Sequence, residues 1–475
     1  MILIFYFIFA IATSVIIYFT SSKTLTTILR NIFLVVQIAL NVYAFIHKGE
    51  VDSEYFKFDS LGILLSLALA VLTLTTFYHS KLFLQRHITN TKRDSAYYAS
   101  LIMLITAMTG AYFASHLAVM WASIEATTIF VAILIYHERT KDALEASWKY
   151  LFISSIGVAI AFMGILFLSA IANEKGVVSL QFTQLLSIAP LMNPTLLKIT
   201  FLLVLTGFSA KMGIIPLHTV TVDAHTAAPS PISAFISTTL MNVGFLGIFR
   251  VYTIVVHSST VDWANSILMI TGVLSISMSA IQLVKIKHFK RMFAFSSLEH
   301  MGIVILAISL GKYGAYAAIL HLVFHSFVKA GLFYQIGQVH SIFHSYWIKD
   351  SGNYFKINPI GSIVIILGFL SITAMPPSGL FISEFLVFKA LFATKHIAVA
   401  ILVLLLLSVI IYVFAKHLFK LLYSPLPEHV NSNTIKINKY ETITQFVLFA
   451  LVIYLGFNPP AFFTDLIQSA IIILN

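Results

Sequence analysis

Apolar stretches of about twenty residues recur along almost the whole chain and are separated by short polar segments. A membrane-spanning helix needs ~20 such residues, because lipid offers no hydrogen-bond partner to an open backbone. With 59% hydrophobic and 10% charged residues among 475, the chain is too apolar for a soluble domain. We therefore predict an all-α polytopic membrane protein with fourteen spans at 2–20, 26–47, 58–79, 96–115, 117–136, 148–171, 197–217, 229–252, 263–284, 291–310, 313–338, 358–392, 396–419 and 442–470.

The two ends of this series need separate comment. The first apolar run, Met1–Phe19, has no basic segment before it and no convincing cleavage site after it, so we interpret it as a membrane helix rather than a signal peptide. The twelfth span is too long for one straight helix and contains Pro376-Pro377, which predicts a broken helix.

The basic residues predict the orientation of the chain. Nineteen of the twenty-nine Lys and Arg residues fall in loops on one side of the predicted membrane, and seven fall on the other. Basic loops mark the cytoplasmic side, which places both termini outside. The formal net charge of +11 therefore reflects topology, and we expect no nucleic-acid partner. The remaining three basic residues, Lys211, Lys329 and Lys389, fall within the spans.

The sequence lacks the residues and motifs that several classes of chemistry require. The chain has no cysteine, which excludes disulfides and thiolate-bound clusters. Its seventeen histidines show no HExxH spacing, and no GxGxxG or Walker pattern is present. We expect no cofactor and no metal in this chain, and any electron transfer must take place in partner subunits.

Ionisable residues inside the spans are the candidate functional groups. Glu125, Glu299 and Glu384 join the three intramembrane lysines. Such residues are energetically expensive in a membrane and usually mark an ion or proton pathway. The alternative is that individual groups extend to the membrane surface or form packing salt bridges.

A proline follows the lysine of the seventh span. Pro216 lacks the amide hydrogen that would reach the carbonyl of Met212, so a polar group is released close to Lys211. Gly207 and Gly213 leave room for water there. A lysine that has lost part of its hydration but still contacts water can exchange protons. An ordinary proline kink that serves packing is the alternative. Three residues after the break could open a proton uptake path or equally cap helix ends: His218, Asp223 and His225.

The eleventh span carries a polar stripe formed by His321, His325 and Lys329. Steps of four residues turn a helix by about 400°, so the side chains share one face over roughly 12 Å. Histidine can pass a proton near neutral pH, and the stripe could form a relay. A single buried histidine would more often be a hydrogen-bonded core residue.

Spans four to eight can be superposed on spans nine to thirteen as inverted five-helix repeats. Span five with Glu125 then matches span ten with Glu299, and the break at Pro216 matches the break at Pro376 and Pro377. Matching breaks in inverted halves indicate a transport site. The expected organisation is 1–95 for helices 1–3, 96–252 for the first repeat, 253–422 for the second, and 423–475 for helix 14.

Two motifs carry a family resemblance. The segments 211–234 and 290–302 resemble the signatures of the antiporter-like subunits shared by respiratory complex I, Mrp-type antiporters and membrane-bound hydrogenases, and the similarity covers spans four to thirteen. Within this family, the chain most resembles component F of hydrogenase-four-type complexes at Glu125–Thr128, Ala146–Tyr150, Ser297–Gly302 and the polar stripe.

The resemblance implies a fourteen-helix fold with two inverted half-channels. It pairs Glu125 with Lys211, includes Glu299 and His300 of the second signature, and runs a hydrophilic axis through the stripe to a terminal proton site at Glu384 or Lys389. Asn242 stands where several members have lysine or histidine, so bridging water would be needed there. We also expect the chain to lack the long lateral helix of the most distal complex I subunit.

We therefore expect a proton-translocating subunit of a redox-driven complex in the plasma membrane of a prokaryote. Its partners would be other membrane and peripheral subunits, and its coupling ion H⁺, with Na⁺ as the alternative. A sodium/proton antiporter subunit of the Mrp type and an energising subunit for inorganic-carbon uptake are the alternatives.

Overall fold

The structure is a computed structural model that describes residues 1–86, 91–426 and 438–474. Thirteen helices in the described part are long and apolar enough to cross a membrane. The predicted span 358–392 is divided into two shorter helices. With this span, the thirteen helices match the fourteen predicted spans, so the prediction of an all-α polytopic membrane protein is confirmed. One of the nineteen basic loop residues, Lys436, lies outside the described residues.

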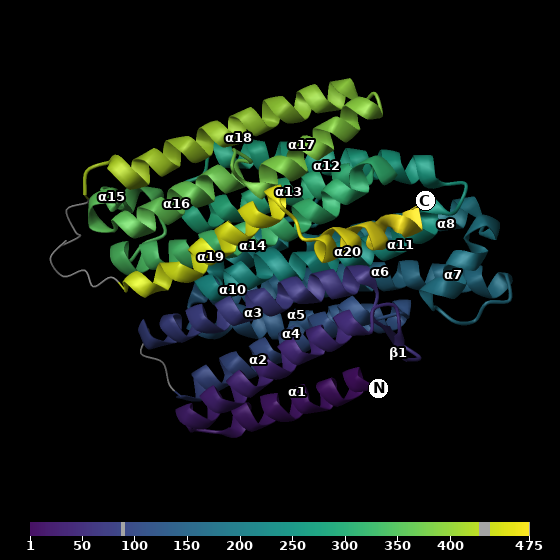
Figure 1. The fold of residues 1–475 in the computed structure, drawn as a ribbon, viewed down its shortest axis with the longest axis horizontal. Helices are drawn as coiled ribbons and strands as arrows, with labels where there is room; N and C mark the ends of the chain where they lie inside the picture. Colours follow the sequence, from purple (N-terminus) through teal and green to yellow (C-terminus); the bar gives the residue numbers. More distant parts are fainter. Residues whose placement is uncertain (87–90, 427–437, 475) are drawn as a thin grey trace. The chain divides into compact units, whose positions relative to one another are not determined.

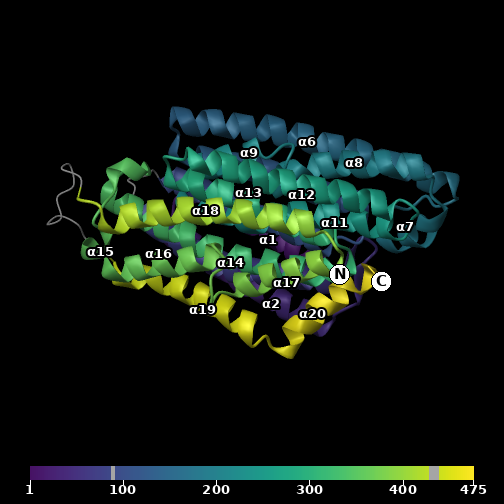
Figure 2. The ribbon, with the colours of Figure 1, turned by 90° about the horizontal axis from the view of Figure 1, so that it is seen from above.

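The chain divides into two compact units. Unit 1 comprises Met1–Ile232, Thr239–Ile267 and Phe462–Asn475. In it, α6 and α8 run side by side, as Figure 2 shows. Its elements are α1 (Ile2–Phe19), α2 (Lys23–Ile46), the antiparallel hairpin of β1 (Val51–Ser53) and β2 (Phe56–Lys57), α3 (Ser60–Arg86), α4 (Thr91–Phe113), α5 (Leu117–Ile135), η1 (Tyr136–Glu138), α6 (Lys141–Glu174), α7 (Phe182–Ile188), η2 (Ala189–Leu191), α8 (Pro194–Met212), α9 (Thr219–Ala227), α11 (Met241–Val256) and η7 (Ile472–Leu474).

Unit 2 comprises Ser233–Thr238 and Leu268–Ala461. Within it, α14 packs against α13, α16, α17 and α19. Its elements are α13 (Phe289–Ile308), α14 (Lys312–Phe343), η4 (Ile348–Asp350), α15 (Tyr354–Ile357), α16 (Pro359–Ile372), α17 (Gly379–Ala393), α18 (Ile397–Tyr423), η6 (Lys439–Thr442) and α19 (Ile443–Phe457). Four elements have residues in both units: α10 (Ser230–Phe235), the π-helix η3 (Ile236–Leu240), α12 (Val261–Val284) and α20 (Ala461–Ile471).

The predicted break in the seventh span is present, but glycine rather than proline ends the helix. Helix α8 stops at Met212, and Gly213 follows with φ +73°, a left-handed conformation that glycine adopts without steric cost. Its N–H donates to the carbonyl of Ser209 at 2.8 Å. Pro216 lies in the connection to α9, so it does not kink a continuous helix as the sequence suggested.

The predicted break in the twelfth span is also confirmed. Helix α16 ends at Ile372 and α17 begins at Gly379, and the two are separate helices in Figure 1. Ser378 caps α17 by accepting from the N–H of Leu380. Each break contains a cis X-Pro bond, Ile215-Pro216 in the first and Pro376-Pro377 in the second. The inverted repeat and the fourfold division of the chain stay predictions.

Candidate functional site

Lys211 of unit 1 is fully enclosed, with 1% of its surface exposed. Its ammonium donates to the hydroxyl oxygens of Thr127 at 3.1 Å, Thr128 at 2.7 Å and Tyr150 at 3.1 Å. An ammonium has three N–H donors, and these three acceptors satisfy all of them. The site therefore accommodates a charged lysine without a carboxylate in direct contact.

Small residues bring the surrounding helices close to Lys211. A Cβ added at Gly157 of α6 would lie 2.8 Å from the carbonyl oxygen of Gly207 on α8. At Gly244 of α11, an added Cβ would overlap the backbone nitrogen of Met212. Close backbone approach at small residues is how helices pack in membranes. The glycines thus fix the end of α8, which carries the lysine, against both α6 and α11.

Thr128 connects the lysine with Glu125. Its hydroxyl donates to Oε2 of Glu125 at 3.3 Å and accepts from Lys211. The other carboxylate oxygen of Glu125 accepts from Ser155 at 3.0 Å. Within the described part of the chain, no ion pair joins the two residues, and one hydroxyl separates the acid from the base. The two predicted partners are thus linked through the hydroxyl of Thr128.

The other predicted residues of unit 1 lie on α9 and α11. His218 precedes α9 and is 7% exposed, but its side chain makes no hydrogen bond that caps this helix. His225 lies within α9, and Asn242 lies in the first turn of α11; both are fully buried. Asp223 is half-buried on α9 rather than in a loop. The role of these residues in proton transfer stays a prediction.

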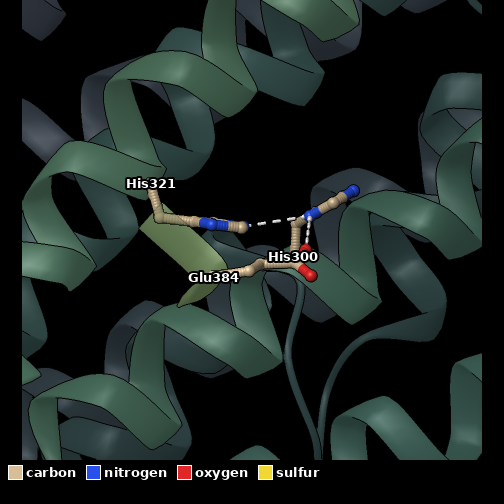
Figure 3. A group of neighbouring side chains, drawn as sticks. All are labelled: His300, His321 and Glu384. Atoms are coloured by element: carbon tan, nitrogen blue, oxygen red, sulfur yellow. Dashed lines mark hydrogen bonds and ion pairs between the residues drawn. The ribbon is translucent and has the colours of Figure 1, made fainter. Parts of the chain in front are cut away.

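In unit 2, three helices bring two histidines and an acid together (Figure 3). Nδ1 of His300 on α13 lies 3.0 Å from Nε2 of His321 on α14 and 4.0 Å from Oε1 of Glu384 on α17. Both imidazoles are fully buried, and Glu384 is 9% exposed. The sequence predicted all three as functional residues, and the fold places them beside one another.

The hydrogen bonds define which nitrogen carries each proton. The hydroxyl of Ser383 donates to the carbonyl of Leu380 at 3.0 Å, so its oxygen accepts from Nδ1–H of His321 at 2.9 Å. Nε2 of a neutral His321 is then an acceptor, and the proton between the two rings belongs to Nδ1 of His300. The three side chains form a directed chain of hydrogen bonds from His300 through His321 to Ser383.

The remaining members of the polar stripe lie on the same side of α14. The His325 ring centroid is 5.2 Å from that of His300, and Lys329 donates to the carbonyl of Phe293 at 2.7 Å. Glu299 on α13 is buried, and among the described residues its Oε2 has no hydrogen-bond partner. These titratable side chains therefore lie buried where α13 packs against α14.

Lys389 is not part of this cluster. It lies on α17 with Glu384, but its side chain is exposed, whereas Glu384 is buried. Of the two terminal proton sites that the sequence proposed, only Glu384 faces the histidines.

Sequence reasoning missed the hydroxyls that connect the charged groups, because Thr127, Thr128, Tyr150 and Ser383 are not conspicuous in an apolar span. It also missed a buried polar cluster near the other end of α14. Gln338 donates to Glu441 at 3.2 Å and accepts from Asn358 at 3.0 Å. Gln335 donates to both Gln338 and Tyr354 at 2.8 Å. The cluster lies further along α14 than Lys329, toward the C-terminal end of the helix.

Comparison with known proteins places these features in a family. Residues 114–411 match the family described as NADH:quinone oxidoreductase/Mrp antiporter, TM. The chain is 32% identical over 365 residues to the hydrogenase-4 component F homolog of Methylacidiphilum infernorum (isolate V4), covering 74% of this chain and 76% of the relative.

Two solved structures are similar in fold. A chain of the membrane-bound sulfane sulfur reductase, an archaeal respiratory membrane complex, gives a TM-score of 0.87 at 21% identity, covering 100% of this chain and 97% of that chain. A chain of the Mrp complex from Dietzia sp. DQ12-45-1b gives 0.85 at 15% identity, covering 98% and 96%. On the family match and the 32% identity, the chain belongs to the family of membrane subunits shared by NADH:quinone oxidoreductase and Mrp antiporters.

Proposed function

We propose that this chain is the proton-translocating membrane subunit of a redox-driven complex. The observation that carries the proposal is the enclosed Lys211, which is separated from Glu125 by a single hydroxyl whose hydrogen bonds run from base to acid. A lysine buried only for helix packing would not need an acid connected to it through a hydroxyl. The name of the hydrogenase-4 component F homolog supports a partner module that carries out electron transfer.

In unit 1, a proton moves between base and acid through Thr128. Lys211 gives one proton to the threonine oxygen while the threonine gives its own hydroxyl proton to Glu125. The hydroxyl is regenerated, the lysine becomes neutral, and the carboxylate becomes a carboxylic acid. The reverse transfer recharges the lysine, so the pair can alternate between an ionised and a neutral state.

In unit 2, the two imidazoles perform the corresponding transfer. When His300 holds a proton on each ring nitrogen, it can pass its Nδ1 proton to Nε2 of His321, which leaves a neutral His300 and a cationic His321 whose Nδ1–H stays hydrogen-bonded to Ser383. Glu384 faces the same nitrogen of His300 at 4.0 Å. Unit charges at that separation attract by about 4 kcal/mol at an effective dielectric near 20. The charge on the acid therefore controls whether His300 holds a second proton.

The chain is a multi-pass membrane protein by family and by its apolar helices. The excess of basic residues in one set of loops supports an orientation with both termini on the outer side of a prokaryotic plasma membrane. Peripheral partner subunits that transfer electrons would then lie on the basic, cytoplasmic side. This chain itself would carry protons and no electrons.

The test is proton transport by the complex isolated through this subunit and reconstituted into proteoliposomes. Hydrogen and NADH are supplied in turn as electron donors, and internal pH is followed with a pH-sensitive dye. Donor-dependent pH change that a protonophore abolishes supports the proposal. Sodium-dependent exchange without any donor would replace it by a sodium/proton antiporter, and bicarbonate-dependent uptake without a donor would replace it by inorganic-carbon transport.

A further inference from the structure

The His300–His321–Glu384 cluster has the donor set of a metal site. Among the described residues, these three side chains each offer one ligand atom, and the three atoms lie within 4.8 Å of one another. Imidazole nitrogen and carboxylate oxygen are ligands of Zn²⁺, usually in tetrahedral geometry. The histidines and the acid come from three different helices, so the packing of α13, α14 and α17 positions the site.

The separations fit a tetrahedral ion. Bonds of about 2.0–2.1 Å place adjacent tetrahedral ligands roughly 3.3 Å apart. The nitrogens of His300 and His321 are 3.0 Å apart, and the His300 nitrogen is 4.0 Å from the Glu384 oxygen. These two distances lie on either side of the tetrahedral value, and changes of less than an ångström satisfy it.

His321 already has the outer hydrogen bond that is typical of a metal-bound histidine. Metal-bound histidines usually donate their other ring N–H to a fixed acceptor, which sets the tautomer. His321 does so with Nδ1–H to Ser383, and its Nε2 lone pair points toward His300. Water would complete the coordination, because Glu384 retains some exposed surface.

We propose that this cluster binds Zn²⁺, and that the bound ion blocks proton transfer. The ion and the transferred proton require the same two nitrogens, so binding displaces the proton that joins His300 to His321, and a neutral His300 then carries its proton on Nε2. With both imidazoles and the carboxylate ligated, none of the three can change protonation state. The blocking part of the inference rests on the proposed function, whereas the binding part does not.

The binding test uses the full-length chain, purified in detergent with its co-purifying subunits and titrated with ZnSO₄. We expect saturable binding of one ion, with a zinc-edge X-ray absorption spectrum of nitrogen and oxygen ligands. His300→Gln, His321→Gln and Glu384→Gln should each lower the affinity more than a hundredfold. Ser383→Ala, a milder change, should lower it by about ten- to a hundredfold. His417→Gln on α18, a histidine outside the cluster, should bind as the unaltered chain does.

The transport test adds Zn²⁺ to the proteoliposomes. Inhibition in the unaltered complex at the concentration that fills the site, and weaker inhibition in Ser383→Ala, support the inference. Absence of stoichiometric binding, or affinity unchanged in all three ligand variants, overturns it even where protons are pumped. Stoichiometric binding in a complex that pumps no protons leaves the metal site standing and refutes the proposed function instead.

Discussion

Thr128→Val is the sharpest perturbation of the lysine site, because valine has nearly the shape of threonine but no hydroxyl. The variant removes the shortest of the three Lys211 hydrogen bonds, at 2.7 Å, together with the only hydrogen bond by which Thr128 reaches Glu125. A hydrogen bond to a charged group contributes roughly 1.5–3 kcal/mol. At 1.4 kcal/mol per factor of ten, loss of one such bond makes the charged lysine about ten- to a hundredfold harder to form.

We therefore expect donor-driven proton transport by Thr128→Val to fall at least tenfold, while the complex still assembles. Thr128→Ser keeps the hydroxyl and should retain most of the activity. Thr127→Val also removes a bond to Lys211, but it leaves the connection to Glu125 and should reduce transport less. Initial rates of dye-detected pH change, normalised to the amount of complex in the vesicles, measure all three. Full activity in Thr128→Val, or an equal loss in Thr128→Ser, would show that the hydroxyl does not relay protons.

Three further results are expected. Glu384→Gln should abolish transport, whereas Lys389→Gln should leave it unchanged because this side chain is exposed; equal loss in both would refute the assignment. Gly244→Ala should destabilise the detergent-solubilised protein by about 1–3 kcal/mol, because its Cβ overlaps Met212, and an unchanged melting temperature would contradict this packing. His288 caps α13 by accepting from a backbone N–H at 3.4 Å, and burial, then Lys290 and Arg291, lower its pKa from 6.5 to about 4. Its contribution to stability is thus present above pH 6.5 and lost as the pH falls toward 4, so His288→Asn should show a smaller drop in melting temperature between pH 7 and pH 4.5 than the unaltered chain.

Charged residues in apolar spans were predictable because their desolvation makes each one conspicuous. Lys211, Glu125 and the α14 stripe were found in this way, and the structure buries Lys211 and the whole stripe. The connecting hydroxyls could not be found, since Thr and Ser are inexpensive in helices and commonly bond to a carbonyl one turn earlier, as Ser326 does to Leu322. Thr128 is distinguished from such a residue only in the folded structure, by its hydrogen bonds with Lys211 and Glu125.

Helix geometry could have excluded Lys389. It lies five residues after Glu384, and at about 100° per residue this step turns the side chain by roughly 140°, to another face of α17. The breaks were predictable from proline, but the end of α8 was not. Gly213 ends it through a left-handed conformation, and a glycine in an apolar span gives no sequence sign of whether it serves packing or termination.

The most direct test of the account is proton pumping by Lys211→Ala in the reconstituted complex. Lys198→Ala on the same helix is the matched control, since Lys198 lies near the other end of α8, over the ring of Trp263. With assembly verified by co-purification of the partner subunits, we predict no donor-driven pH change in Lys211→Ala and normal pumping in Lys198→Ala. Normal pumping by Lys211→Ala would contradict the central claim that this buried lysine carries the proton.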